Sequence, residues 1–137
     1  MQGIEAAGSK SEMSKYLWVG IGGFAGSIAR YALGVWVYSR MGTRFPYGTF
    51  VINISGCFLI GAILTVLDAR IGLSPAWRLA IPIGFIGAYT TFSTFEYETI
   101  RLAQAGETQL ALLNIALSTV VGYFAVWIGV MVGRVLA

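Results

Sequence analysis

A run of hydroxyl and aromatic residues, Gly87-Ala88-Tyr89-Thr90-Thr91-Phe92-Ser93-Thr94-Phe95, interrupts the third of four apolar segments in this chain. Hydrocarbon offers hydroxyls and exposed carbonyls no hydrogen-bond partner, so at membrane depth such groups must face protein or water. Phe92 and Phe95 share a helix face, and their electropositive ring edges could coordinate an anion, although aromatics at this spacing are usually core. A break here would also expose helix ends, whose amides attract anions and whose carbonyls can hold a cation. The run therefore predicts a conduction or binding path for an ion.

Further polar residues repeat every fourth position in the second and fourth apolar segments, which keeps each set on one helix face, and the third segment has a set around its centre. The three sets are Thr49, Asn53 and Cys57; Thr90, Ser93 and Thr94; and Asn114, Ser118 and Gly122. For a single Ser or Thr the plainer reading is a hydroxyl bonded to its own helix. Asn53 has too many donors and acceptors for that, so we expect it to bond across helices or to face the path.

Arg30 is the only full charge deep in an apolar segment. Its long side chain could snorkel to the far headgroups or pair with Glu96 or Glu98. Alternatively, a fixed positive charge at a wet vestibule would concentrate anions.

The side chains that many enzymes use for catalysis are missing from this sequence. The chain has no histidine and no pair of carboxylates deep in its apolar segments, which argues against Ser-His catalysis and carboxylate proton relays. Its single Cys57 has no second soft ligand nearby and is expected to be a small packing residue. The sequence thus argues against an enzyme, and we expect no nucleic-acid partner.

Composition places these residues in a membrane protein. Of the 137 residues 57% are hydrophobic and only 11% charged, and the mean hydropathy is +0.76. A spanning helix needs about 20 apolar residues, and four stretches qualify, at Tyr16–Ser39, Tyr47–Leu67, Ala76–Leu102 and Gln109–Leu136. Residues 1–15 are expected to be a polar N-terminal tail, and residues 16–137 a single membrane domain with short connections.

The positive charges that normally fix membrane orientation are nearly balanced. Arg70, Arg78 and Arg134 would flank one surface and Arg40, Arg44 and Arg101 the other. The chain could therefore insert both ways and pair as an antiparallel dimer, or insert one way despite the count. Small-residue faces at Gly22 and Gly26 and at Gly129 and Gly133 suit close helix packing, either within the chain or between copies.

Taken together, these motifs resemble the Fluc family of bacterial fluoride channels. The resemblance rests on the run after Gly87, on Gly48-Thr49 with Asn53 and Gly56, and on Gly26 with Arg30-Tyr31, and it covers nearly everything after the tail. It implies an all-α membrane protein with a broken third helix, acting as a dual-topology antiparallel homodimer with two pores. Such a protein would lie in the bacterial cytoplasmic (inner) membrane and export fluoride passively.

The resemblance also implies roles for individual residues. Phe92 and Phe95 match the pore phenylalanines, Asn53 the pore asparagine and Ser118 a hydroxyl of the polar track, with Thr49, Ser93, Thr94 and Asn114 as further pore candidates. Arg30 matches a basic vestibule residue. Gly87 and Thr90 match positions whose backbone carbonyls, doubled in the dimer, hold a structural Na⁺.

Two other readings stay open at this stage. A small multidrug-resistance exporter also has four spans and dual topology, but it needs an acidic residue in the first span, where this chain has Arg30. A non-transporting assembly subunit would use the polar stripes only to join helices.

Overall fold

The computed structural model describes residues 2–70 and 72–137, with side chains from Met13 onward, and all regular structure in this part of the chain is helical. The helices are α1 (Gln2–Met41), α2 (Tyr47–Ala69), α3 (Pro75–Arg78), the π-helix η1 (Leu79–Ile86), α4 (Gly87–Tyr89), α5 (Phe92–Gln104) and α6 (Thr108–Leu136). The predicted all-helical class is confirmed. The first helix begins at Gln2 rather than at Tyr16, so α1 continues through the segment expected to be a tail.

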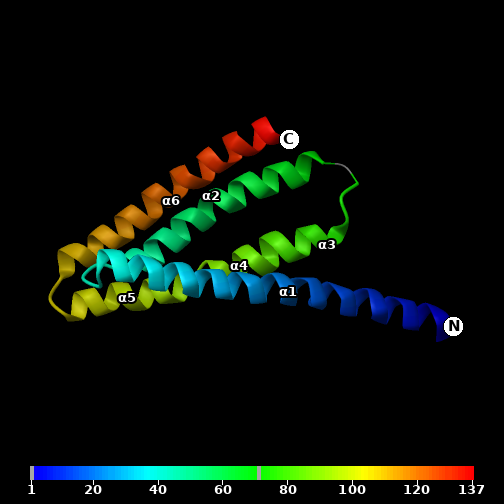
Figure 1. Cartoon of the computed structure of the whole chain (residues 1–137), viewed down its shortest axis with the longest axis horizontal. Coiled ribbons are helices and arrows are strands. Elements are labelled where there is room, and N and C mark those ends of the chain that lie inside the picture. Colours follow the sequence, from blue (N-terminus) through cyan, green and yellow to red (C-terminus); the bar gives the residue numbers. More distant parts are fainter. Residues whose placement is uncertain (1, 71) are drawn as a thin grey trace.

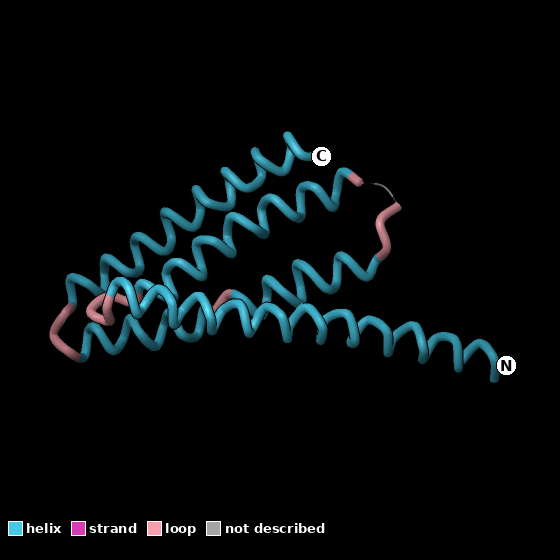
Figure 2. The backbone as a smooth tube through the Cα atoms, viewed as in Figure 1, coloured by secondary structure: helices cyan, strands magenta, loops and turns pink. Residues whose placement is uncertain are grey.

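The helices form two packed pairs. The most extensive contacts are those of α2 with α6 and of α1 with η1 (Figure 1). The short helix α4 also packs against α1, whereas α5 packs mainly against α6. Both termini and the connection between α2 and α3 lie at one end of the molecule, and the other two connections lie at the opposite end (Figure 2). A bundle of this shape holds its polar residues between the two pairs.

Glycines allow both pairs to approach closely. A Cβ on Gly22 or Gly26 would collide with the backbone of η1 at Ala80 or Phe85, and one on Gly129 with the carbonyl of Phe58 in α2. Both small-residue faces are therefore occupied within the chain. Of the two readings that the sequence left open for these faces, packing inside the chain is the one observed.

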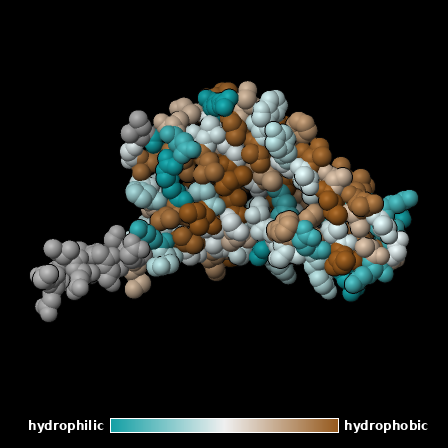
Figure 3. Space-filling view, turned by 180° about the vertical axis from the view of Figure 1, so that it is seen from behind, coloured by the Kyte–Doolittle hydropathy of each residue, from teal (hydrophilic) through white to brown (hydrophobic). Residues whose placement is uncertain are grey.

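Most of the surface between the two ends is apolar. Large hydrophobic side chains on α1 and α6 are exposed, among them Phe24 and Tyr123, and the visible body is mostly brown while teal side chains gather toward the ends (Figure 3). The helices α2 and α6 are each long and apolar enough to cross a bilayer. Apolar surface of this extent needs lipid or protein cover.

The third apolar segment is not one continuous helix. Ser74 caps α3 by accepting a hydrogen bond from the Ala76 amide, and Pro75 occupies the first turn. Pro82 has no N–H to donate, and the turns around it widen into the π-helix η1. Helical geometry stops after Tyr89, because Thr90 and Thr91 are extended, with ψ of 159° and 110°. The spanning segment expected at Ala76–Leu102 thus consists of two helical arms joined by two extended residues, Thr90 and Thr91.

The end of α5 has a specific stop signal. Gly106 has a φ of +81°, the left-handed conformation that glycine adopts without steric cost. The Gly106 amide donates to the Ala103 carbonyl, and the Glu107 amide to the Leu102 carbonyl, as in a Schellman motif. This tight turn returns the chain directly into α6.

Candidate functional site

The break between α4 and α5 is held by one side chain from another helix. Asn53, in the middle of α2, accepts a hydrogen bond from the Thr91 N–H at 2.8 Å and donates to the Thr91 carbonyl at 3.0 Å. The amide thus pairs with Thr91 as a neighbouring backbone would. The expectation that Asn53 bonds across helices is confirmed.

These bonds release two backbone carbonyls. In a continuous helix the Thr91 N–H would donate to the Gly87 carbonyl and the Thr94 N–H to the Thr90 carbonyl. Here the first donates to Asn53, and the second to the Thr91 hydroxyl at 3.3 Å. The Gly87 and Thr90 carbonyls, to which the family resemblance assigned a role, are therefore the ones whose regular helical donors are diverted. Carbonyl oxygens are ligands that hard cations accept.

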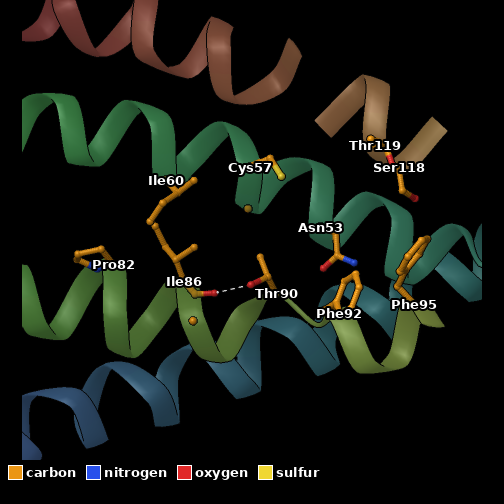
Figure 4. A pocket seen from close by; sticks show the side chains of 12 residues that line it. Asn53, Cys57, Ile60, Pro82, Ile86, Thr90, Phe92, Phe95, Ser118 and Thr119 are labelled. Carbon is orange, nitrogen blue, oxygen red and sulfur yellow. Dashed lines mark hydrogen bonds between the residues drawn. The ribbon is translucent and has the colours of Figure 1, made fainter. Parts of the chain in front are cut away.

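The break opens into a cavity of about 490 Å³ between α2, the interrupted segment and α6 (Figure 4). Its wall combines small, apolar and hydroxyl side chains with the Asn53 amide. The lining residues are Asn53, Gly56, Cys57, Ile60, Pro82, Ile86, Gly87, Thr90, Phe92, Phe95, Ser118 and Thr119. Six of the residues predicted from the sequence, namely Asn53, Gly87, Thr90, Phe92, Phe95 and Ser118, meet at this one cavity.

The two phenylalanines lie one turn apart at the start of α5, beside Asn53 (Figure 4). Their ring centroids are 5.7 Å apart and the ring planes are inclined by 37°. Phe95 is buried, as a core residue would be, but Phe92 is 74% exposed in the single chain. Core packing therefore accounts for Phe95 and does not account for Phe92.

Several lining residues were missed by sequence reasoning. Gly56 leaves room for the Thr90 methyl group, because a Cβ at position 56 would collide with that methyl group. The Thr91 hydroxyl caps α5, a role that the Thr91-x-x-Thr94 spacing could have indicated. Pro82 and Ile86 reach the cavity only because η1 and α4 stop where they do.

Four predicted pore residues do not line this cavity. Asn114 is 1% exposed and donates to the Thr99 hydroxyl at 2.8 Å, which joins α6 to α5. Thr49 is buried near the start of α2, while Ser93 and Thr94 are exposed on the first turn of α5. The Thr90 hydroxyl bonds back to the Ile86 carbonyl at 3.0 Å, as a hydroxyl inside a helix commonly does.

Arg30 is half-buried and also lies outside the cavity. Arg44 pairs with Glu107 and Arg78 with Asp68, and among the described residues Arg30 forms an ion pair with neither Glu96 nor Glu98, so that alternative is not observed. Glu98 instead accepts a hydrogen bond from the Tyr38 hydroxyl at 2.8 Å.

The cavity offers complementary groups for ions of either sign. The first turn of α5 presents unsatisfied amides and a positive partial charge, which favour an anion. The released carbonyls of Gly87 and Thr90 favour a cation. Over the described residues, no cluster of three His, Cys, Asp or Glu side chains forms a metal site, so the donors here are backbone groups, amides, hydroxyls and ring edges.

Comparison with known proteins places these features in a wider group. A family model described as "CrcB-like protein, Camphor Resistance (CrcB)" matches residues 17–130. A protein of Acidobacterium capsulatum named "Fluoride-specific ion channel FluC" is 66% identical over 120 residues, which cover 88% of this chain and 96% of that protein. Proteins of the same name from Solibacter usitatus and Sorangium cellulosum are 49% and 43% identical; they cover 88% and 89% of this chain, which in turn spans 98% and 96% of them.

Proposed function

The chain belongs to the family of CrcB-like proteins, and we propose from this premise that it is a channel selective for fluoride. The relatives from Acidobacterium capsulatum and Solibacter usitatus carry that function in their names, and this chain matches them over nearly their whole length. The protein is thus a membrane transport protein and not an enzyme. Fluoride would move passively, and the negative interior of a bacterial cell would drive the anion outward.

The observation that carries the proposal is the meeting of Asn53, Phe92, Phe95 and Ser118 at the helix break. Fluoride is small and strongly hydrated, so donors close to the ion must replace the water that it loses. Asn53 uses one of its two N–H donors on the Thr91 carbonyl, which leaves the second for an anion. The Ser118 hydroxyl and the ring edges of Phe92 and Phe95 would add contacts that favour a negative ion.

The remaining polar candidates would serve the path outside the cavity. Thr49 lies one turn before Asn53 on α2, and Asn114 one turn before Ser118 on α6. Ser93 and Thr94 flank Phe92 at the exposed start of α5. Arg30 would raise the local anion concentration from a vestibule. Their roles stay predictions, tested by the same flux measurements.

We further propose that the functional unit is an antiparallel homodimer of four-span subunits with two pores, in the inner membrane. Phe92 and Gly87 both lie on exposed surface of the single chain although they border the cavity. A second copy would cover this surface and close the cavity against lipid. The near balance of arginines at the two ends of the bundle supports insertion in both orientations.

A Na⁺ ion at the dimer axis fits the donors present. The Gly87 and Thr90 carbonyls are diverted from helical bonding, and two copies related by a two-fold axis would supply four such oxygens. When bound, the ion would tie the two breaks together and fix the backbone beside Asn53. It would have a structural role, and the chain's own donors would handle the anion.

The test is fluoride efflux from liposomes that contain the purified protein, followed with a fluoride electrode under a K⁺ gradient shunted by valinomycin. Chloride efflux is measured in parallel. We expect rapid, electrogenic release of fluoride and little release of chloride. Folded, dimeric protein that releases neither ion would overturn the proposal.

A further inference from the structure

A second cavity, of about 480 Å³, lies at the end of the bundle that carries the α1–α2 and α5–α6 connections. Unlike the first cavity, it is lined by charged groups. Arg44 and Glu107 come from the two connections, Glu98 and Arg101 from α5, and Tyr38 from α1. Neither the sequence motifs nor the site at the break uses this set.

Two helices run from this cavity to the helix break. On α5, Phe95 borders the first cavity, while Glu98 and Leu102, three and seven positions later on the same face, border the second. Asn53 on α2 borders the first cavity, and Pro46, directly before α2, borders the second. Seven helical residues span about 10 Å, so the two cavities follow one another along both helices.

A polar contact joins α1 to α5 in the wall of the second cavity. The Tyr38 hydroxyl donates to Glu98 Oε1 at 2.8 Å, and Glu98 Oε2 is buried without a hydrogen-bond partner among the described residues. Gly48 leaves room for the Tyr38 ring, because a Cβ there would collide with it. An anion that passes through this cavity would meet the Glu98 carboxylate, which opposes its passage.

Arg101 is placed to offset that charge. It follows Glu98 by three positions, lines the same cavity and is exposed, and no carboxylate in the described structure lies within ion-pair distance of it. Arg44 differs, because it is loosely paired with Glu107 at 3.8 Å at the outer edge. Arg101 is therefore the cationic group of this cavity that is not neutralised by a partner.

On the basis of the proposed function, we propose that fluoride passes through this second cavity, as an antechamber, between solution and the helix break. Arg101 would attract the anion into it. A fixed charge at a narrow mouth raises the rate at which an oppositely charged ion arrives by about 10- to 1,000-fold, and dissolved salt screens the effect. The contribution of Arg101 should therefore depend strongly on ionic strength.

The test compares Arg101→Gln, Arg101→Lys and the control Arg134→Gln in the liposome efflux assay, at about 20 mM and about 500 mM of an impermeant salt. Arg134 is exposed at the opposite end of α6 and lines neither cavity, so the control removes an equal charge elsewhere. We expect Arg101→Gln to lower fluoride efflux about 10-fold at low salt and under about twofold at high salt. Arg101→Lys and Arg134→Gln should match the parent chain.

The outcomes separate this proposal from the one on which it rests. If the parent chain releases no fluoride, the channel function itself fails. If the parent conducts and Arg101→Gln equals it at both salt concentrations, the antechamber proposal is overturned. A loss that is the same at both concentrations and is shared by Arg101→Lys would also overturn it, because shape and not charge would then be the cause.

Discussion

Replacing Asn53 by alanine should both weaken the fold at the helix break and abolish most fluoride conduction. The substitution removes the two hydrogen bonds, of 2.8 and 3.0 Å, that tie Thr91 to α2. It leaves the Thr91 N–H and carbonyl without these partners at the edge of a cavity that water can reach. Leaving a buried polar group unpaired costs about 1–3 kcal/mol, and partial access to water lowers that figure.

The two losses together amount to about 2–4 kcal/mol. Since 1.4 kcal/mol corresponds to a factor of ten, the ordered break would become roughly 30- to 700-fold less favoured relative to open arrangements. Phe92 and Phe95 follow the break directly, so their ring edges would no longer be held beside the path. The free energy of unfolding and the rate of fluoride efflux should therefore fall together.

A second variant separates stability from conduction. Asn53→Asp keeps an oxygen that can accept the Thr91 N–H, but it sets a carboxylate against the Thr91 carbonyl and adds a negative charge beside the path. We expect it to lose less stability than Asn53→Ala while conducting no better. The exposed amide of Gln109 supplies the matched control, since Gln109→Ala removes a side-chain amide far from the break.

The assay is unfolding of the purified protein in a denaturing detergent, followed by the fluorescence of its 4 tryptophans, with efflux measured on the same preparations. An Asn53→Ala protein that unfolds like the parent and conducts like the parent would refute the role assigned to the cross-helix amide. A loss of the same size in Gln109→Ala would refute it as well, because the effect would then not be specific to the break.

Three further predictions follow from the same geometry. Phe92→Ile should reduce fluoride efflux by at least about tenfold without changing the yield of dimer, because an aliphatic side chain has no electropositive edge, whereas Phe124→Ile on the exposed face of α6 should leave efflux unchanged. Gly26→Ala should destabilise the protein by about 1–3 kcal/mol, because the added methyl group meets the Phe85 carbonyl; Gly20→Ala, with nothing within 4 Å, should be neutral in the same unfolding assay, and equal effects would contradict the packing described. Exchanging Na⁺ for a large organic cation should lower the unfolding midpoint of the dimer, and restoring Na⁺ to about 100 times its dissociation constant should return about 2.7 kcal/mol; a midpoint indifferent to Na⁺ would remove the proposed ion.

The sequence is informative about the third segment, but it does not give the bounds of the separate helices within it. Its polar run predicts an interruption near Thr90, where the chain is indeed extended. The π-helix around Pro82 was not expected, and it lies where α1 approaches closely at Gly22 and Gly26. Local composition indicates that a helix is disturbed, and packing determines how the disturbance is absorbed.

Asn114 illustrates a different limit. Its spacing from Ser118 is the same as that of Asn53 from Cys57, so both amides looked equally suited to a pore. In the fold Asn114 is buried against Thr99, whereas Asn53 faces the break. Periodicity gives the residues that share a face, but it does not say which neighbouring helix that face meets.

The sequence by itself determined the class of the protein and the candidate chemistry. The excess of apolar residues, the short connections and the hydroxyl run after Gly87 follow from composition and local order, which need no knowledge of distant contacts. Only the tertiary structure decided that the Thr91 N–H donates to Asn53 and not to the Gly87 carbonyl, because Asn53 and Thr91 lie 38 positions apart in the chain. Helix rotation and close packing set such contacts, and these depend on every neighbouring side chain at once.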